Sequence, residues 1–503
     1  MFVGLDYIVI VIYLALVSAA GLWFGRKEKD TTDFFLGGRQ MPWGAVMFSI
    51  LATEMSAVTF LSVPGVAFKE NLIYFQFTIG SLFGRILIAF LFLPAFYRGR
   101  VVTVYEYLKQ RFGNRSRDAG TAFFFGIRLV GSGLRLCLTA KALEVLSGLS
   151  YFQAICIVAF LAVVYTGFGG IKAVIWTDVV QFAIFIGGAG LTLYLILNMI
   201  PGGVRGAYSV LRDAVDAGGA PAHKLRVFDF AISFTQPGVF FIAVLNGCFQ
   251  TFAALGTDQD MTQRMLTCQN VRRAKRSLLL TGIAKFPIDA LFLLLGAALY
   301  AFNTHHLFAD GGIAPDHVFP TFIGTVLPVG LRGLLFAAIL AAAMSSLDSA
   351  LSALSSSAIT DIYKPYIRKH ATERHYLVAS RMCVLLFAIL LMAIAYLSRG
   401  DESILWRAFR LTGYAYGSLL GVFLAGVLTR RGNNVGNILA MTSSIGVLLT
   451  IRHWVFPALN WQFFVIIGTL WTFGVAVLFR APSHRDPDSE APLLAPENRA
   501  NLA

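Results

Sequence analysis

Charged side chains are scarce in this sequence. Aspartate, glutamate, lysine and arginine make up 14% of its 503 residues, whereas hydrophobic residues make up 57%. In a soluble globular chain, about a quarter of the residues are charged. The apolar residues also fall in successive blocks of roughly 20, the length that crosses a ~30 Å hydrocarbon core as a helix. This pattern excludes a soluble fold around one core and predicts an all-α integral membrane protein.

Cysteine is also rare, and the chemistry that cysteine clusters support is missing. The five cysteines are scattered and show neither metal-ligand spacing nor a disulfide framework. No catalytic triad, metal motif or phosphate-binding loop stands out, so we do not expect an enzyme. The net charge of +14 does not indicate a nucleic-acid partner, because the basic residues lie in short loops between apolar blocks.

Hydropathy predicts about 13 transmembrane helices. Basic residues follow every odd-numbered span, which predicts that those loops are cytoplasmic and that the N-terminus lies outside the cell (inner or plasma) membrane. Residues 1–6 lack the basic start of a cleavable signal, so we expect the first span to remain in the protein. The tail at 481–503 is predicted to be disordered and cytoplasmic. The predicted spans are 5–25, 42–66, 72–97, 119–147, 151–168, 174–199, 236–256, 278–303, 331–357, 378–397, 404–428, 434–452 and 460–480.

Polar residues interrupt the second span, where each costs several kcal/mol unless it is paired or hydrated. The run from Ala52 to Phe60 holds the Glu54 carboxylate and three hydroxyls, and Pro64-Gly65 follows. This composition predicts a helix broken near its middle, where carbonyl groups bind a cation and N–H groups bind a solute. The alternative is a proline kink with the hydroxyls bonded back to their own helix.

Span nine carries a second oxygen-rich face. Ser345, Ser349, Ser352 and Ser356 recur at three- and four-residue steps, so their hydroxyls share one side of a helix. Asp348 adds a carboxylate, and hard cations prefer oxygen ligands. The alternative is that these small residues serve only close helix packing.

Other charged residues also fall inside predicted spans. Asp178 lies near the cytoplasmic start of span six, where a helix N-cap is one interpretation. Lys285 and Asp289 are four residues apart in span eight, a spacing at which they neutralise one another. Arg85 in span three has no evident partner in the sequence.

Span four carries two arginines on roughly one face, Arg128 and Arg135. One interpretation is a cationic lining for an anionic solute. The other is pairing, or snorkelling of the long side chains toward the ends of the span.

A set of motifs runs along the chain in order. They are Phe-Phe-Leu-Gly-Gly-Arg at 34–39, the run 52–65, Tyr-Glu-Tyr-Leu at 105–108 with Arg111-Phe112, the segment 165–181, Gly-Thr-Asp-Gln at 256–259 with Gln263-Arg264, the segment 341–349, and Asp-Ile-Tyr-Lys at 361–364. Together they resemble the sodium/solute symporter family, which includes bacterial sodium/galactose, sodium/proline and sialic-acid symporters. The likeness extends over roughly residues 5–480.

The resemblance implies a core of two inverted five-helix repeats with broken helices, formed by spans two to six and seven to eleven. In span seven, the polar, small-residue run 246–251 stands where the second break is expected. The implied segments are 1–41 for the first helix and its loop, 42–199 for the first repeat, 200–235 for an external loop, 236–432 for the second repeat, 433–480 for two additional helices, and 481–503 for the tail.

The resemblance also implies that one or two sodium ions bind, with no organic cofactor. Asp348 departs from the serine found in sialic-acid members, which leaves the number of ions open. The sodium site shared by the family would use the carbonyls of Ala52, Met55 and Ala342 and the hydroxyls of Ser345 and Ser346. A second sodium site would use Asp178, Ser345, Asp348 and Ser349.

For the solute, the family's contact positions fall on spans two, three, four, seven and eight. The arginine that grips the carboxylate in sialic-acid symporters aligns with Gly131, one helical turn from two arginines of this chain. The predicted solute site comprises Glu54, Ser56, Thr59, Thr78, Arg128, Arg135, Gln250, Thr251 and Lys285.

These features predict sodium-coupled symport of a small organic solute by alternating access, with a sugar or sugar derivative as the leading candidate. An organic anion, such as sialic acid or a monocarboxylate, and an amino acid are the alternatives. A membrane solute sensor is the rival from another class, and a passive channel is less compatible with broken helices. The expected partners are the solute, sodium and the lipid bilayer, and we expect the protein to function as a monomer.

Overall fold

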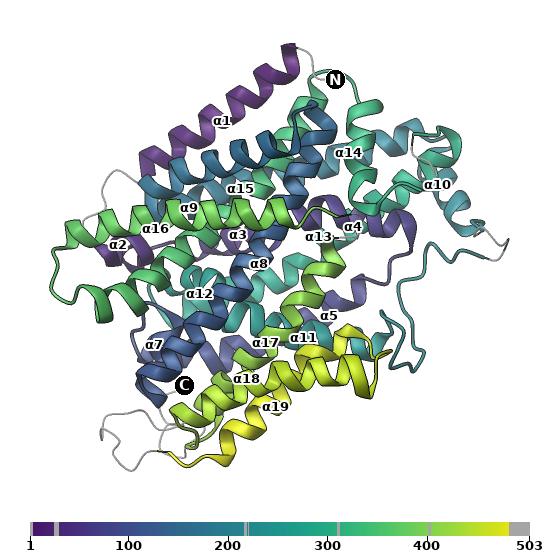
Figure 1. Ribbon diagram of the computed structural model, residues 1–503. Helices are drawn as coiled ribbons and strands as arrows, with labels where there is room; N and C mark the ends of the chain where they lie inside the picture. The colour runs from purple at the N-terminus through teal and green to yellow at the C-terminus, as the bar shows by residue number, and fades with distance from the viewer. Residues whose placement is uncertain are drawn as a thin grey trace.

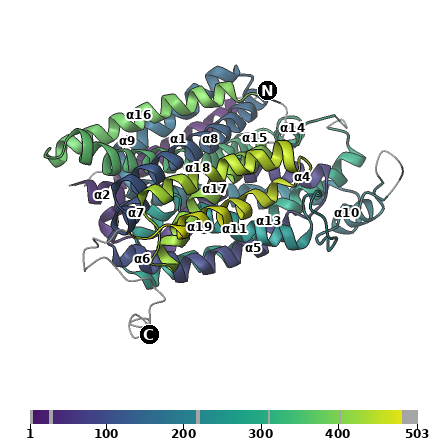
Figure 2. The ribbon, with the colours of Figure 1, turned by 60° about the horizontal axis from the view of Figure 1, so that its bottom comes forward.

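The computed structural model describes residues 4–24, 30–215, 219, 221–308, 312–400 and 404–481. Within these residues the secondary structure is helical apart from two isolated bridges, Met41 with Cys268 and Val215 with Pro221. The long helices lie side by side in one bundle (Figure 1 and Figure 2). The all-α prediction is confirmed. The tail from residue 482 onward, predicted to be disordered, lies outside the described residues.

The helices of the first half are α1 (Gly4–Phe24), α2 (Thr31–Leu36), η1 (Gly37–Arg39), α3 (Trp43–Glu54), α4 (Ala57–Lys69), α5 (Phe75–Leu87), η2 (Ile88–Phe92), α6 (Leu93–Arg98), α7 (Val104–Phe112), α8 (Asn114–Ser147), α9 (Tyr151–Met199) and α10 (Gly203–Arg212). Those of the second half are α11 (Phe240–Gly256), α12 (Gln259–Leu266), α13 (Val271–His305), α14 (Pro315–Thr325), α15 (Leu331–Ser357), η3 (Ala358–Ile367), α16 (Glu373–Leu397), α17 (Ile404–Leu428), α18 (Asn434–Thr450), η4 (Ile451–Val455), η5 (Trp461–Phe463) and α19 (Phe464–Leu478).

Nine helices in the described residues are long and apolar enough to cross a membrane. The number rises to 11 if each of two sharply bent helix pairs is counted as one span. Two shorter apolar helices cover Gly4–Val17 and Tyr151–Val164. Each predicted span coincides with one of these helices, while the total of about 13 crossings stays a prediction.

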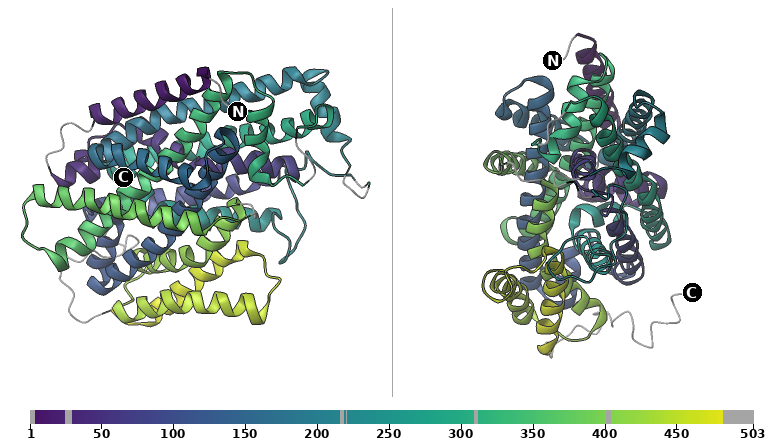
Figure 3. Two further views of the ribbon diagram at one scale, coloured as in Figure 1. Left: turned by 45° about the horizontal axis from the view of Figure 1, so that its top comes forward. Right: turned by 90° about the vertical axis from the view of Figure 1, so that its right-hand side faces the viewer.

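The serine-rich helix α15 lies inside the bundle. In its most apolar window, 94% of the residues are buried, whereas the figure for α16 is 28%. Helix α15 contacts α1, α3, α4, α8 and α9. Its hydroxyl face therefore meets other helices rather than lipid. Helices α18 and α19 lie together on one flank of the bundle (Figure 3).

Predicted spans five and six form one long element, α9, which bends at Gly170. This glycine has φ 52° and ψ −165°, a conformation that a residue with a side chain adopts only under strain. The bend divides α9 into the short helix from Tyr151 and the membrane-length helix Gly170–Met199.

The predicted break in span two is present. Helices α3 and α4 meet at an angle of 53°, and the non-helical residues between them are Met55 and Ser56. The Ser56 hydroxyl accepts a hydrogen bond from the N–H of Val58 and so caps α4. Pro64 lies within α4 and does not make the break.

The second break is not where the sequence predicted it. Helix α11 continues through 246–251, and the bend of 65° follows it at Thr257 and Asp258. The polar run has another role, because the Asn246 amide donates to the carbonyl of Gln462 at 2.7 Å and Gly247 allows a close crossing. The prediction mistook a packing surface for a break.

Helices α5 and α11 cross with almost no side chain between them. A Cβ atom on Gly80 would lie 1.9 Å from the carbonyl oxygen of Val244, and one on Gly247 would lie 2.3 Å from that of Phe77. Only glycine fits at these two positions. The crossing thus connects α5, which follows the bent pair α3 and α4, to α11, the first helix of the bent pair α11 and α12.

Candidate functional site

A cavity lies beside the bend between α3 and α4. Its volume is about 140 Å³. Every residue predicted for the solute site lines this cavity except Thr78. The lining residues are Glu54, Ser56, Val58, Thr59, Tyr74, Phe77, Ile127, Arg128, Gly131, Arg135, Gln250, Thr251, Ala254, Leu255, Met261, Lys285, Ala408, Phe409, Thr412 and Tyr416.

Four charged side chains, three of them buried and Glu54 partly exposed, form a cluster at one wall of the cavity. Glu54, the last residue of α3, pairs with Arg85 of α5, and its Oε1 lies 3.7 Å from Nζ of Lys285. Lys285 also pairs with Asp289 at 3.1 Å, as their spacing predicted. Within this cluster the two carboxylates and the two cations balance in charge, which limits the cost of burial.

Arg85 is fully buried and is not the lone charge that the sequence suggested. Besides Glu54, its guanidinium contacts the hydroxyls of Ser81 and Thr281, so its partners come from α3, α5 and α13. Glu54 is 31 residues away in the sequence, and only the fold brings the two together.

Thr78 lies outside the cavity lining. It is fully buried on α5, and its hydroxyl donates to the Asp289 carboxylate. It therefore contacts the charged cluster from a side that the cavity does not reach.

The two arginines of α8 differ in their partners. Arg128 pairs with Asp258 and with Asp260, the latter at 2.8 Å, and the hydroxyl of Tyr416 also donates to Asp258. Arg135 forms no ion pair with any described residue, and its Nη1 is buried without a hydrogen-bond partner there. Of the two interpretations offered for these arginines, pairing with carboxylates describes Arg128, whereas Arg135 provides a cationic lining for the cavity.

The remaining polar groups around the cavity are neutral. The Thr251 hydroxyl donates to that of Ser81 at 2.9 Å, and the Gln250 amide donates to the Thr412 hydroxyl at 3.4 Å. Ser56 and Thr59 come from the start of α4, next to the bend. The cavity therefore offers hydroxyl and amide groups as well as charge.

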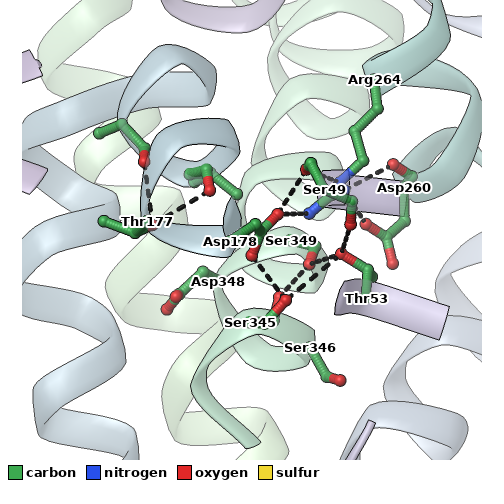
Figure 4. Close-up of polar contacts among 12 residues, drawn as sticks. Ser49, Thr53, Thr177, Asp178, Asp260, Arg264, Ser345, Ser346, Asp348 and Ser349 are labelled. Atoms are coloured by element: carbon green, nitrogen blue, oxygen red, sulfur yellow. Dashed lines mark hydrogen bonds and ion pairs between the residues drawn. The ribbon is translucent and has the colours of Figure 1, made fainter. Parts of the chain in front are cut away.

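A second polar cluster lies where α3, α9, α12 and α15 meet (Figure 4). The Asp178 carboxylate accepts hydrogen bonds from Ser49 and Ser345, each at 2.5 Å, and pairs with Arg264 at 3.0 Å. Asp178 lies well inside α9, so it does not cap that helix. The structure thus brings the predicted sodium ligands Asp178 and Ser345 into contact.

The rest of this cluster consists of hydroxyl oxygens from α3 and α15. The Thr53 hydroxyl lies 3.5 Å from those of both Ser345 and Ser349. The Ser346 hydroxyl donates to the carbonyl of Ala342, its own helix, at 3.2 Å. Thr53 was not among the predicted sodium ligands. It lies one helical turn after Ser49 on α3, so the two hydroxyls share one face of that helix.

Ala52 and Met55, whose carbonyls were predicted as ligands, are fully buried at the end of α3 and in the bend. Asp348 is fully buried on α15 and accepts a hydrogen bond from the Thr166 hydroxyl at 3.0 Å. Figure 4 draws Asp348 on the far side of Asp178 from Arg264.

Sequence reasoning missed the aromatic residues of the cavity. Tyr74, Phe77 and Phe409 line both this cavity and a second one of about 350 Å³ next to it. The ring centroids of Phe77 and Phe409 are 5.4 Å apart, and Phe409 stacks on Trp461 at 5.8 Å. Nothing in the sequence marks these three residues as cavity residues, since aromatic residues in apolar spans more often face lipid or the protein core.

The sequence pattern of the sodium:solute symporter family matches residues 34–445. The chain belongs to this family. A sodium/sialic acid symporter of Aliivibrio fischeri is 30% identical to this chain in sequence, and the match covers 93% of this chain and 91% of that protein. A sodium/glucose cotransporter of Vibrio parahaemolyticus is 28% identical, over 96% and 92% of the two chains.

A solved structure gives the same result for the fold. It describes the substrate-bound, outward-open state of a sodium-coupled sialic acid symporter, and it superposes on this symporter with a TM-score of 0.84 at 26% identity. The match covers 95% of this chain and 98% of the other. The symporter is therefore a sodium-coupled, multi-pass membrane transporter and not an enzyme.

Proposed function

We propose that the symporter imports a small sugar derivative that carries a carboxylate group. Arg135 carries this proposal, because its guanidinium lines the cavity without an ion-pair partner among the described residues, whereas Arg128 and Lys285 are already paired. A carboxylate would complete the hydrogen bonds of that guanidinium. The neutral hydroxyl and amide groups nearby suit the hydroxyls of a sugar.

A neutral sugar is the second candidate, and it is favoured by the charge balance of the Glu54 cluster. That cluster presents Glu54 and Lys285 to the cavity with no charge left over. The sialic acid and glucose transporters among the relatives support one candidate each. A monocarboxylate and an amino acid remain further alternatives, which the same experiment tests.

For sodium, we propose two sites around α15. The shared site would lie between the bend of the first pair and α15, and the second would lie at Asp178. Support comes from the oxygen cluster of Asp178, Ser345 and Ser349, which is fully buried. The proposed ligands are Ala52, Met55, Ala342, Ser345 and Ser346 for the shared site, and Asp178, Ser345, Asp348 and Ser349 for the second.

We propose that transport follows alternating access. Sodium at the bend would favour an outward-open state, and solute would then bind in the cavity before a rocking motion exposes both to the cytoplasm. The aromatic group of Tyr74, Phe77 and Phe409 separates the cavity from the second, larger one, so it is suited to close the outer side. We also propose that the symporter lies in the cell membrane with its N-terminus outside and its C-terminus in the cytoplasm, and that one chain is the working unit.

The test is uptake into proteoliposomes. Purified protein is reconstituted into vesicles, and an inward sodium gradient is imposed across the vesicle membrane. Accumulation of N-acetylneuraminate, glucuronate, glucose, lactate and proline inside the vesicles is then measured. Sodium-dependent accumulation above the outside concentration is the expected result for the acidic sugars. Binding of any of these solutes without accumulation would instead support a sensor.

We expect Arg135→Gln to weaken binding of the acidic sugars by about tenfold to hundredfold, because a hydrogen bond to a charged group contributes about 1.5–3 kcal/mol. Glucose binding should stay within about twofold of the parent, since the change removes no group that a neutral sugar requires. Thermal-shift titrations in sodium buffer measure both. Unchanged affinity for the acids would contradict the carboxylate proposal and leave the neutral sugar as the substrate class.

A further inference from the structure

A chain of buried ion pairs connects the solute cavity with the proposed sodium site. It runs from Arg128 on the cavity wall to Asp260, from Asp260 to Arg264, and from Arg264 to Asp178. The three contacts measure 2.8 Å, 2.8 Å and 3.0 Å. All four side chains are at most 5% exposed. We call these four residues the relay.

The geometry of the relay makes each inner member divide its interactions between two partners. Asp260 contacts Arg128 through Oδ2 and Arg264 through Oδ1. Arg264 contacts Asp260 through Nη1 and Asp178 through Nη2, and its Nε donates to the Ser49 hydroxyl. Each inner side chain thus shares a single unit of charge between two partners.

The position of α12 explains why the relay exists. This short helix is the second half of the bent pair that begins with α11, and it carries both Asp260 and Arg264. Their four-residue spacing aligns them on one face, from which Asp260 contacts Arg128 of α8 and Arg264 contacts Asp178 of α9. The sequence hides this arrangement, since the two ends of the relay belong to α8 and α9.

We infer that the relay couples sodium binding to solute binding, and that Arg264 is the residue that transmits the effect. This inference rests on the sodium site proposed above at Asp178. A sodium ion at Asp178 would compete with Arg264 for the carboxylate. Arg264 would then interact more strongly with Asp260, and Arg128 would keep Asp258 while its Nη1 became available to an anion in the cavity.

The charges of the relay and its neighbour Asp258 agree with this direction. The ion-paired group contains the carboxylates of Asp178, Asp258 and Asp260 and the guanidiniums of Arg128 and Arg264. It therefore has one carboxylate in excess, and a bound sodium ion would balance it. Coupling between two ligands is reciprocal, so an anion that draws Arg128 away from Asp260 is expected to raise sodium affinity, and removal of the Arg128 charge should have the same effect.

The experiment uses sodium alone as the probe. Sodium-dependent thermal stabilisation of the purified full chain is titrated at constant ionic strength, with N-methylglucamine replacing sodium. We expect Arg128→Gln to lower the half-maximal sodium concentration about fivefold, because Asp260 then holds Arg264 alone. In an Arg264→Lys background the same substitution should change it less than about twofold, since lysine keeps the charge but lacks the fork that bridges two carboxylates.

The matched control is Arg111→Lys, the same change in a buried arginine outside the relay, which donates to the carbonyls of Gly426 and Thr429. In that background the full effect of Arg128→Gln should persist. If Arg128→Gln does not fold, Asp260→Asn replaces it, with about a fivefold rise expected that also disappears with Arg264→Lys.

Equal shifts in both backgrounds would show a long-range electrostatic effect and overturn the relay, as would no shift in either. An unaltered chain without any sodium-dependent stabilisation would contradict the proposed sodium site itself. The two failures are therefore distinguishable, and neither depends on identifying the solute.

Discussion

Replacement of Ser345 by alanine is expected to raise the sodium concentration for half-maximal uptake at least about tenfold, a change of about 1.4 kcal/mol in sodium binding. The Ser345 hydroxyl belongs to both proposed sodium sites and donates to Asp178 at 2.5 Å. Alanine keeps the helix and removes only the oxygen. The sodium activation curve of uptake in proteoliposomes measures the effect, and Asp178→Asn should shift it in the same direction.

Ser352→Ala is the matched control for this prediction. Ser352 lies two turns further along α15, is buried, and its hydroxyl has no hydrogen-bond partner among the described residues. Its sodium activation curve should match that of the parent. A parental curve for Ser345→Ala would show that sodium does not bind between α3 and α15.

Arg85→Met is expected to lower the free energy of unfolding by about 3–5 kcal/mol, the usual cost of removing one partner from a buried ion pair. Glu54 would keep only the more distant Lys285, at 3.7 Å, and that lysine is already shared with Asp289. The midpoint of thermal unfolding of the purified protein measures the loss.

The double variant Arg85→Met with Glu54→Leu provides the control. It removes both charges together, leaves Lys285 paired with Asp289, and should recover most of the lost stability. Uptake should remain impaired in the double variant, since Glu54 lines the cavity. A double variant no more stable than the single one would mean that Arg85 acts through Ser81 and Thr281 rather than through Glu54.

The sequence predicted features whose cause is local. The bend in span two follows from residues 52–56 themselves, where Ser56 can cap a new helix once the first ends at Glu54. The Lys285–Asp289 pair follows from helical spacing. The same local logic failed at Gly247, because a glycine that allows a close crossing and a glycine that ends a helix look alike without the partner helix.

Long-range pairing is what the sequence could not provide. Arg128 and Asp258 are 130 residues apart, and nothing near either one indicates the other. Arg128 is paired and Arg135 is not, and this difference becomes visible only once the partner of every nearby carboxylate is known. Eight of the nine residues predicted for the solute site do line the cavity, but the sequence could not say which charge remained for a ligand.

The contact between α5 and α11 also restricts how the cavity can change its width. The backbones touch at Gly80 and Gly247, and a sliding motion would bring the larger neighbouring side chains into this contact. We therefore expect the two helices to move together during the transport cycle. Opening of the cavity is therefore expected to come from displacement of α8 and α17, which also line the cavity and would carry Arg135 and Phe409 away from α5 and α11.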